Sequence, residues 1–95
     1  MSEEQWTDVS IQQADFDAVT EELIRQHNKW GVQTRSPFEW LAYLTEEVGE
    51  VSDAIQGLVY GVRTIAIGRD MKKEIYDECI QVATLALKMA RMVKQ

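Results

Sequence analysis

The segment from Met71 to Val93 constrains the fold most, because its residues repeat with a helical period and are apolar on most sides of that helix. Its apolar residues after Ile80 include Val82, Ala83, Leu85, Ala86, Leu87, Met89 and Ala90. A helix of this kind needs to be covered on nearly every side. A chain of 95 residues is near the small end for a domain that builds its core alone. The sequence therefore predicts an all-α subunit that associates with further copies of itself.

A second helix precedes this segment and has the clearest start. Ser36-Pro37-Phe38-Glu39 combines an N-cap serine, a proline at the first helical position and a glutamate at the capping-box position. The apolar residues that follow at intervals of three and four are Leu41, Leu44, Val48, Val51, Ile55 and Leu58. They form one apolar stripe. We expect this helix to run to about Gln56.

The remaining chain contains one more helix and one ambiguous connector within a single domain, residues 1–95. The first helix is predicted from about Ser10 to Lys29 and is closed by Gly31, after a flexible tail of residues 1–8. The connector, residues 58–69, is interrupted by glycines and is compatible with a short helix, an extended piece or a loop.

Asp70 follows this connector and is a plausible N-cap for the third helix. Two acidic pairs have the same spacing inside the predicted helices, Glu47/Glu50 and Glu74/Asp77. Each pair places two carboxylates about one turn apart on one helix face. Four clustered carboxylates would repel one another, and a divalent cation relieves that repulsion most directly. The alternative is that they are solvated residues at the ends of amphipathic helices, and spacing alone does not decide.

Composition excludes several classes of function. The formal net charge of −6 and the lack of a basic cluster argue against a nucleic acid or an anionic membrane as the main partner. The single Cys79 cannot form an intramolecular disulfide, and no apolar run is long enough for a membrane span, so we expect a cytoplasmic protein. The single His27 leaves a zinc site without its usual ligands.

The run from Trp40 to Val51, followed by Glu74-Ile75-Tyr76-Asp77, resembles the signature E-E-x-x-E then E-x-x-D of a known family. This is the family of MazG-like nucleotide pyrophosphohydrolases, within the all-α nucleoside triphosphate pyrophosphatase superfamily. The stretch from Gln26 to Gly31 is also similar to the end of the family's first helix.

The resemblance implies an enzyme that uses Mg²⁺, with Mn²⁺ as a possible substitute, to hydrolyse nucleoside triphosphates. Its substrates would often be deoxynucleotides and its products the monophosphate and pyrophosphate, in a house-cleaning role or in control of the nucleotide pool. The residues that match the metal ligands are Glu47, Glu50, Glu74 and Asp77. Glu46 matches the first acidic position, where it would orient or deprotonate the attacking water. The subunit would be a helical hairpin that forms a four-helix bundle core through dimerisation or tetramerisation.

The substrate-binding residues are less clear from the resemblance. Some relatives carry an aromatic residue one turn after the aspartate of E-x-x-D, where it packs on the base, but this chain has Gln81 there. Trp30 or His27 are the alternatives for contacting the base, although Trp30 would also serve to close the core. Lys73 and Lys88 are candidate phosphate partners, and both are also explained as solvated charges.

Two other classes of function are alternatives to this one. A di-iron carboxylate bundle requires Glu-x-x-His motifs, which the chain lacks. A non-catalytic helical interaction or regulatory module would have kept the fold and lost the chemistry, yet all four ligand positions are acidic. Within the superfamily, a phosphoribosyl-ATP pyrophosphatase or a dUTPase-like enzyme is a nearer alternative. The base and the sugar that the site prefers stay open.

Overall fold

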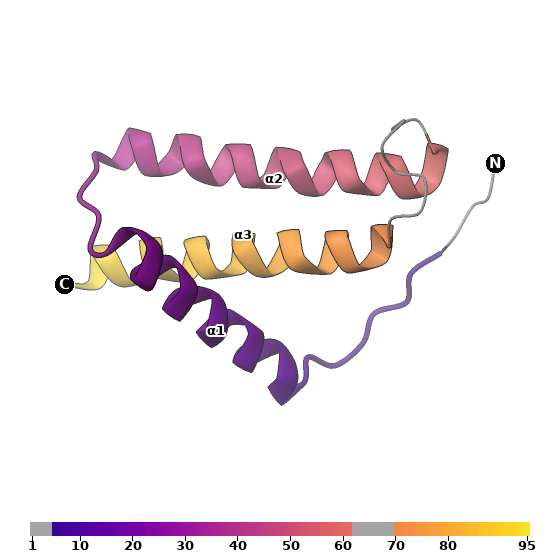
Figure 1. The fold of residues 1–95 in the computed structure, drawn as a ribbon, viewed down its shortest axis with the longest axis horizontal. Helices are drawn as coiled ribbons and strands as arrows, with labels where there is room; N and C mark the ends of the chain where they lie inside the picture. Colours follow the sequence, from indigo (N-terminus) through magenta and orange to yellow (C-terminus); the bar gives the residue numbers. More distant parts are fainter. Residues whose placement is uncertain (1–4, 62–69) are drawn as a thin grey trace.

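The computed structural model describes residues 5–61 and 70–95, and within them the chain forms three α-helices and no strand. These are α1 (Gln13–Trp30), α2 (Pro37–Tyr60) and α3 (Met71–Lys94). Helices α2 and α3 lie antiparallel and side by side as a hairpin, and α1 crosses α3 obliquely (Figure 1). The prediction of an all-α subunit is confirmed.

The helix ends follow from local hydrogen bonds that the sequence predicts. The Ser36 hydroxyl accepts a hydrogen bond from the Glu39 backbone N–H at 3.2 Å, and the Glu39 carboxylate accepts one from the Ser36 N–H at 3.1 Å. Asp70 caps α3 by accepting from the Lys73 N–H at 3.1 Å. Gly31 ends α1 with φ of 67° and donates to the His27 carbonyl at 2.8 Å. Each of these residues satisfies backbone groups that a helix end leaves without partners.

The end of α2 differs from the prediction. The helix continues one turn past Gln56, through the buried Gly57 to Tyr60. Leu58 packs against the core, so burial of the continuing apolar stripe outweighs the low helix propensity of glycine. Gly61 ends the helix in the left-handed region, with φ of 61°. The rest of the ambiguous connector, residues 62–69, lies outside the described residues.

The start of α1 also differs from the prediction. It begins at Gln13, where the Asp15 backbone N–H donates to the Gln12 carbonyl at 3.0 Å, rather than near Ser10. The Asp15 carboxylate accepts a hydrogen bond from the Gln12 N–H at 2.9 Å. The same carboxylate accepts from the Tyr76 hydroxyl at 2.9 Å and so ties the start of α1 to α3.

The core is small and lies between α2 and α3. Its buried cluster consists of Ala54, Met71 and Ile75, with Ile55 and Leu58 packed against it. Towards the other end of the hairpin, Trp40 and Leu85 are also buried. This arrangement brings the middle of α2, which carries Glu47, against the middle of α3.

Large apolar side chains remain exposed on both helices of the hairpin. Leu41 and Val48 on α2 are each 50% exposed, and Leu87 on α3 is 58% exposed. Ala90 is exposed beside Leu87, whereas Ile80 and Ala83 are partly buried. The single subunit therefore leaves these apolar side chains of its described residues in contact with solvent. None of the described helices is long and apolar enough to cross a membrane.

We expect the protein to sediment as a dimer or tetramer, because the Leu87 and Ala90 face of α3 gains from burial against a second subunit. Leu87→Glu should shift the equilibrium towards the 10.9 kDa subunit by placing a charge in that contact. Val32→Glu is a matched control, since Val32 is exposed in the connector between α1 and α2. A folded wild-type monomer at micromolar concentration in analytical ultracentrifugation would contradict the prediction.

Candidate functional site

Three carboxylates from two helices meet in the middle of the hairpin. Glu47 and Glu50 lie one turn apart on α2, and Glu78 faces them from α3. One carboxylate oxygen of each residue lies within 4.8 Å of the others. We call these three residues the acidic cluster. Its geometry depends on α2 and α3 packing side by side, since neither helix supplies all three groups.

Burial and mutual repulsion make the ionised form of this cluster costly. The pKa of Glu78 rises from its ordinary 4.5 to about 7, first through burial and then through contact with Glu50 and Glu47. Burial, followed by repulsion from Glu50, also raises the pKa of Glu47. The Oε2 atoms of Glu47 and Glu78 are buried and accept no hydrogen bond from the described residues. Either a shared proton or a bound cation would relieve this cost.

The donor set of the acidic cluster fits a hard divalent cation. It offers carboxylate oxygens alone, which Mg²⁺ and Mn²⁺ prefer as ligands. The buried oxygens of Glu47 and Glu78, which accept no hydrogen bond there, are the atoms that a cation would satisfy. Glu47, Glu50 and Glu78 are therefore the residues that could hold the ion.

The raised pKa values predict how stability depends on pH when no metal is bound. A carboxyl whose folded-state pKa is raised stabilises the fold below its unfolded pKa of 4.5, and that contribution is lost as the pH rises through about 7. Glu47 acts in the same direction. Asp15, Glu22 and Glu39 have lowered pKa values, so their contribution is already complete above about pH 5 and stays constant.

We therefore expect the Tm in EDTA to fall between about pH 5.5 and about pH 8. Solvent screens these partly exposed carboxylates, so the expected loss is on the order of 1 kcal/mol, or roughly 4–8 °C for a domain of this size. Glu78→Gln should flatten the profile, because the amide does not ionise. Scanning calorimetry of both proteins tests this, and a wild-type Tm that rises over the same range would contradict it.

The sequence-predicted metal ligands separate into two groups in the structure. Glu47 and Glu50 meet in the acidic cluster, as their spacing predicts. Glu74 is partly buried on α3, one turn before Glu78. Asp77 is exposed and accepts a hydrogen bond from Lys73 at 2.6 Å in an ion pair. The ligand roles of Glu74 and Asp77 stay a prediction from the motif.

Sequence reasoning missed Glu78. A signal for it exists, because Met71, Ile75 and Leu85 are buried on α3 and Glu78 continues their spacing of three, four and seven residues. Asp77 lies about 100° further round the same helix. Glu46, the predicted residue for water activation, is exposed on α2 beside the cluster, and its charge helps to raise the pKa of Glu47.

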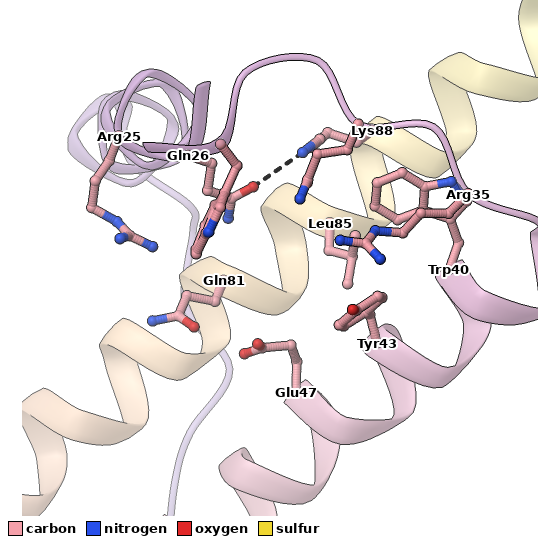
Figure 2. Close-up of a pocket in the computed structure, with 11 residues that line it drawn as sticks. Arg25, Gln26, Arg35, Trp40, Tyr43, Glu47, Gln81, Leu85 and Lys88 are labelled. Atoms are coloured by element: carbon pink, nitrogen blue, oxygen red, sulfur yellow. Dashed lines mark hydrogen bonds between the residues drawn. The ribbon is translucent and has the colours of Figure 1, made fainter. Parts of the chain in front are cut away.

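A cavity of about 280 Å³ adjoins the acidic cluster, between the three helices and the connector of α1 and α2. Its described lining residues are Arg25, Gln26, Trp30, Gln33, Arg35, Trp40, Tyr43, Glu47, Gln81, Leu85 and Lys88. We call it the aromatic pocket. Figure 2 shows Glu47 reaching from α2 towards α3, with Arg35 and Tyr43 on one side of its carboxylate and Gln81 from α3 on the other. Glu47 is the one carboxylate among these lining residues.

Positive groups lie over the rings of this pocket. The Arg35 guanidinium lies 4.6 Å from the Tyr43 ring centroid and 5.9 Å from that of Trp40. The Lys88 ammonium lies 5.6 Å from the Trp40 centroid and donates a hydrogen bond to the Gln26 Oε1 at 3.1 Å. Neither Arg35 nor Lys88 forms an ion pair with a residue of the described ranges 5–61 and 70–95. Their charges act at longer range on Glu39 and Glu22, whose pKa values are lowered first by hydrogen bonds with Ser36 and Arg25 and then in part by Arg35 and Lys88.

Some of the predicted substrate-binding residues line this pocket and others do not. Trp30, Gln81 and Lys88 line the aromatic pocket, whereas His27 and Lys73 do not. Lys73 is engaged with Asp77.

Arg35, Trp40 and Tyr43 were missed by sequence reasoning. The spacing of Trp40, Tyr43 and Glu47 by three and four residues is the signal, since it places both rings on the face of α2 that carries the carboxylate.

Comparison of the chain with known proteins gave no match, whether with a family model, a curated protein or a solved structure. The resemblance to the MazG-like signature therefore rests on the residues of this chain alone.

Proposed function

We propose that this protein hydrolyses nucleoside triphosphates, deoxynucleotides among them, to the monophosphate and pyrophosphate in a Mg²⁺-dependent reaction. The observation that carries the proposal is the position of Glu47. Its side chain belongs both to the acidic cluster and to the lining of the aromatic pocket. A polyphosphate held at the cluster would thus lie beside rings that can accept a base and cations that can pair with its charge.

Each part of the site has a role in this reaction. Glu47, Glu50 and Glu78 would hold the ion, with Glu74 and Asp77 as further ligands proposed from the motif. A bound Mg²⁺ would supply neutralisation of phosphate charge and a lowered pKa for water. Glu46 is exposed next to this group and would accept a proton from the attacking water or orient it.

The pocket supplies binding rather than proton transfer. The guanidinium of Arg35 and the ammonium of Lys88 would attract the anionic substrate. Tyr43 is 40% exposed and would offer a ring on which a base can stack, whereas Trp40 is buried beneath Arg35 and Lys88 and supports the wall of the pocket. The pocket is near the small end for ligand sites, which suits a base and sugar with the phosphates extending towards Glu47.

The proposal predicts monophosphate and pyrophosphate as the first products from a panel of canonical, deoxy and modified triphosphates, resolved by chromatography. EDTA should stop the reaction and Mn²⁺ should replace Mg²⁺ at least in part. Ca²⁺ should support it poorly, because its looser coordination geometry positions water less well. Release of orthophosphate and a diphosphate would place the attack at the γ-phosphorus and contradict the assigned chemistry.

The same panel separates the alternative functions. A dUTPase-like or phosphoribosyl-ATP pyrophosphatase activity would appear as a strong preference for dUTP or for phosphoribosyl-ATP. The exposed Leu41, Val48 and Leu87 also suit a non-catalytic interaction module. An oligomer that hydrolyses no member of the panel would favour that function. A homodimer or homotetramer is part of either proposal.

A further inference from the structure

We infer that Arg25 binds a phosphate group of the substrate and that Glu22 is the positioning residue that orients it. The inference rests on the proposed function for the class of ligand, a nucleoside triphosphate. It adds to that function a phosphate contact from α1 and the residue that fixes its geometry. Two features of the structure support it, namely the hydrogen bonds that hold Arg25 and its place between two cavities.

Glu22 is held in place by a chain of hydrogen bonds that joins α1 to α3. Its side chain is only 12% exposed. Glu22 Oε2 accepts a hydrogen bond from Gln26 Nε2 at 2.7 Å, and Gln26 Oε1 in turn accepts one from the Lys88 ammonium at 3.1 Å. Both ends of the Gln26 amide are therefore engaged. Because this chain crosses between two helices, the Glu22 carboxylate is a fixed anchor for a neighbouring cation.

The Arg25 guanidinium is bound to this anchor along one edge. Its Nε donates to Glu22 Oε1 at 2.8 Å, and its Nη2 donates to Glu22 Oε2 at 2.7 Å. Such a bidentate pair fixes the plane of a guanidinium. Among residues 5–61 and 70–95, the Nη1 group of Arg25 donates to none, and half of the Arg25 side chain is exposed. Arg25 is therefore oriented and still has donors for an oxyanion.

Arg25 lies where two cavities meet. One is the aromatic pocket, and the other is a cavity of about 340 Å³ between α1 and α3. Arg25 lines both of them, whereas Glu47 lines the first and Asp77 the second. Figure 2 shows Arg25 extending from α1 on the side of the aromatic pocket where Gln81 lies. A triphosphate that extends from this pocket past Glu47 towards Asp77 would therefore pass Arg25.

The charges around Arg25 also suit a phosphate. The pKa of Arg25 is raised first by its hydrogen bonds with Glu22 and further by the charge of Glu47. The guanidinium is therefore within electrostatic reach of the carboxylate that the acidic cluster and the pocket share. A phosphate held by a metal at Glu47 would be attracted by the same guanidinium, whose planar set of donors matches phosphate oxygens.

The test is the affinity of α,β-imido deoxynucleoside triphosphates in Mg²⁺, measured by titration calorimetry, since the proposed reaction would not cleave their P–N–P linkage. Arg25→Gln should weaken the best-bound analogue about tenfold or more, the loss expected for a hydrogen bond between charged groups. Glu22→Gln should weaken it about threefold or more, because the neutral amide no longer binds both nitrogens of Arg25. The double variant should bind no more weakly than Arg25→Gln alone, since Glu22 acts through Arg25.

Two controls and a second measurement separate positioning from support of the fold. Arg91→Gln removes an exposed arginine from the last turn of α3, and Asp17→Asn removes an exposed charge from α1. Both should bind the analogue within about twofold of the wild type, as expected for surface charges that touch no ligand. The Tm of the Arg25 and Glu22 variants should stay near that of the wild type, because an ion pair with a half-exposed arginine contributes little to stability.

Several outcomes would overturn the inference. A wild-type protein that binds no analogue, or an Arg25→Gln protein that binds as tightly as the wild type, removes Arg25 from the phosphate site. Tighter binding by Glu22→Gln would show that Glu22 competes with the phosphate for Arg25. Losses that add in the double variant would show that Glu22 acts independently, and a Tm that falls together with the affinity would show that the pair only supports the fold.

Binding is measured without turnover, so the failure of this inference and the failure of the proposed function are distinguishable. Binding of the analogue that depends on Arg25, without hydrolysis of any natural triphosphate, would leave the inference standing. Hydrolysis with a KM that is independent of Arg25 would leave the function standing and overturn the inference.

Discussion

Glu47→Ala is expected to reduce hydrolysis to the background rate and to abolish Mg²⁺ binding at the acidic cluster. Glu47 is the residue shared by the cluster and the aromatic pocket, and its buried Oε2 accepts no hydrogen bond from the described residues. Its loss removes a ligand and also the link between the metal and the base site. Activity measured with the best substrate of the panel, together with Mg²⁺ titration calorimetry, tests both expectations.

The same substitution should raise the Tm of the protein in EDTA. The pKa of Glu47 is raised by burial and by repulsion from Glu50, so the ionised side chain destabilises the metal-free fold near neutral pH. Asp17→Ala is a suitable control, because Asp17 is an exposed acid of α1 that only accepts a local hydrogen bond from Gln13. A Glu47→Ala protein that retains both turnover and Mg²⁺ binding would remove this carboxylate from the site.

Asp77→Ala gives a sharp comparison with Glu78→Ala. The motif assigns Asp77 to the ligands, so its replacement should also abolish activity. The structure pairs Asp77 with Lys73 at the surface, where an ion pair contributes little to stability, so its loss should leave the Tm in EDTA nearly unchanged. Glu78→Ala should raise that Tm, because the pKa of Glu78 is raised to about 7. An active Asp77→Ala protein with an inactive Glu78→Ala protein would assign the ligand role to Glu78.

The sequence predicts those parts of the fold that depend on neighbours along the chain. The caps at Ser36 and Asp70 and the stop at Gly31 are correct, because each is a contact within four residues. The predicted end of α2, at about Gln56, is one turn too early. There, packing of Leu58 on a cluster that includes Met71 and Ile75 of α3 overrides the local preference of Gly57, and a short window along the chain does not contain that contact.

The candidate site also has a part that the sequence predicts and a part that depends on how the helices pack. Glu47 and Glu50 lie together because both belong to one helix face, which their spacing determines. Glu78 joins them through the rotation of α3 against α2, which the packing of Met71 and Ile75 sets. The all-round apolar pattern of α3 did not show which of its faces meets α2.

The aromatic pocket was not predicted from the sequence, because its residues come from three different elements of the fold. Arg35 comes from the connector, Tyr43 from α2 and Lys88 from α3, and none of these positions follows from a motif. The sequence does show which residue types are present and what chemistry each can perform.

For Glu46, a substitution can test whether its carboxylate takes up a proton or binds the metal.

Glu46→Gln should lower turnover by roughly two to four orders of magnitude while Mg²⁺ binding survives, because a carboxylate that accepts a proton from water contributes about this much. Glu46 is exposed, lies outside the acidic cluster and acts on Glu47 through its charge. The amide keeps the shape of the side chain and the ability to orient water, but it cannot take up a proton at neutral pH. Glu46→Gln should therefore separate turnover from metal binding, whereas Glu47→Ala should remove both.

Titration calorimetry and single-turnover kinetics on these two variants distinguish the roles of adjacent carboxylates. Loss of Mg²⁺ binding in Glu46→Gln would move Glu46 into the ligand set. Unchanged turnover would exclude it as the base and as a required positioning group. If turnover instead falls by less than about tenfold, the amide oxygen that the variant retains would still orient the water. Proton abstraction by Glu46 would then contribute little to the rate, since abstraction carries the larger factor. In that case the proton would pass to solvent, to which Glu46 is exposed.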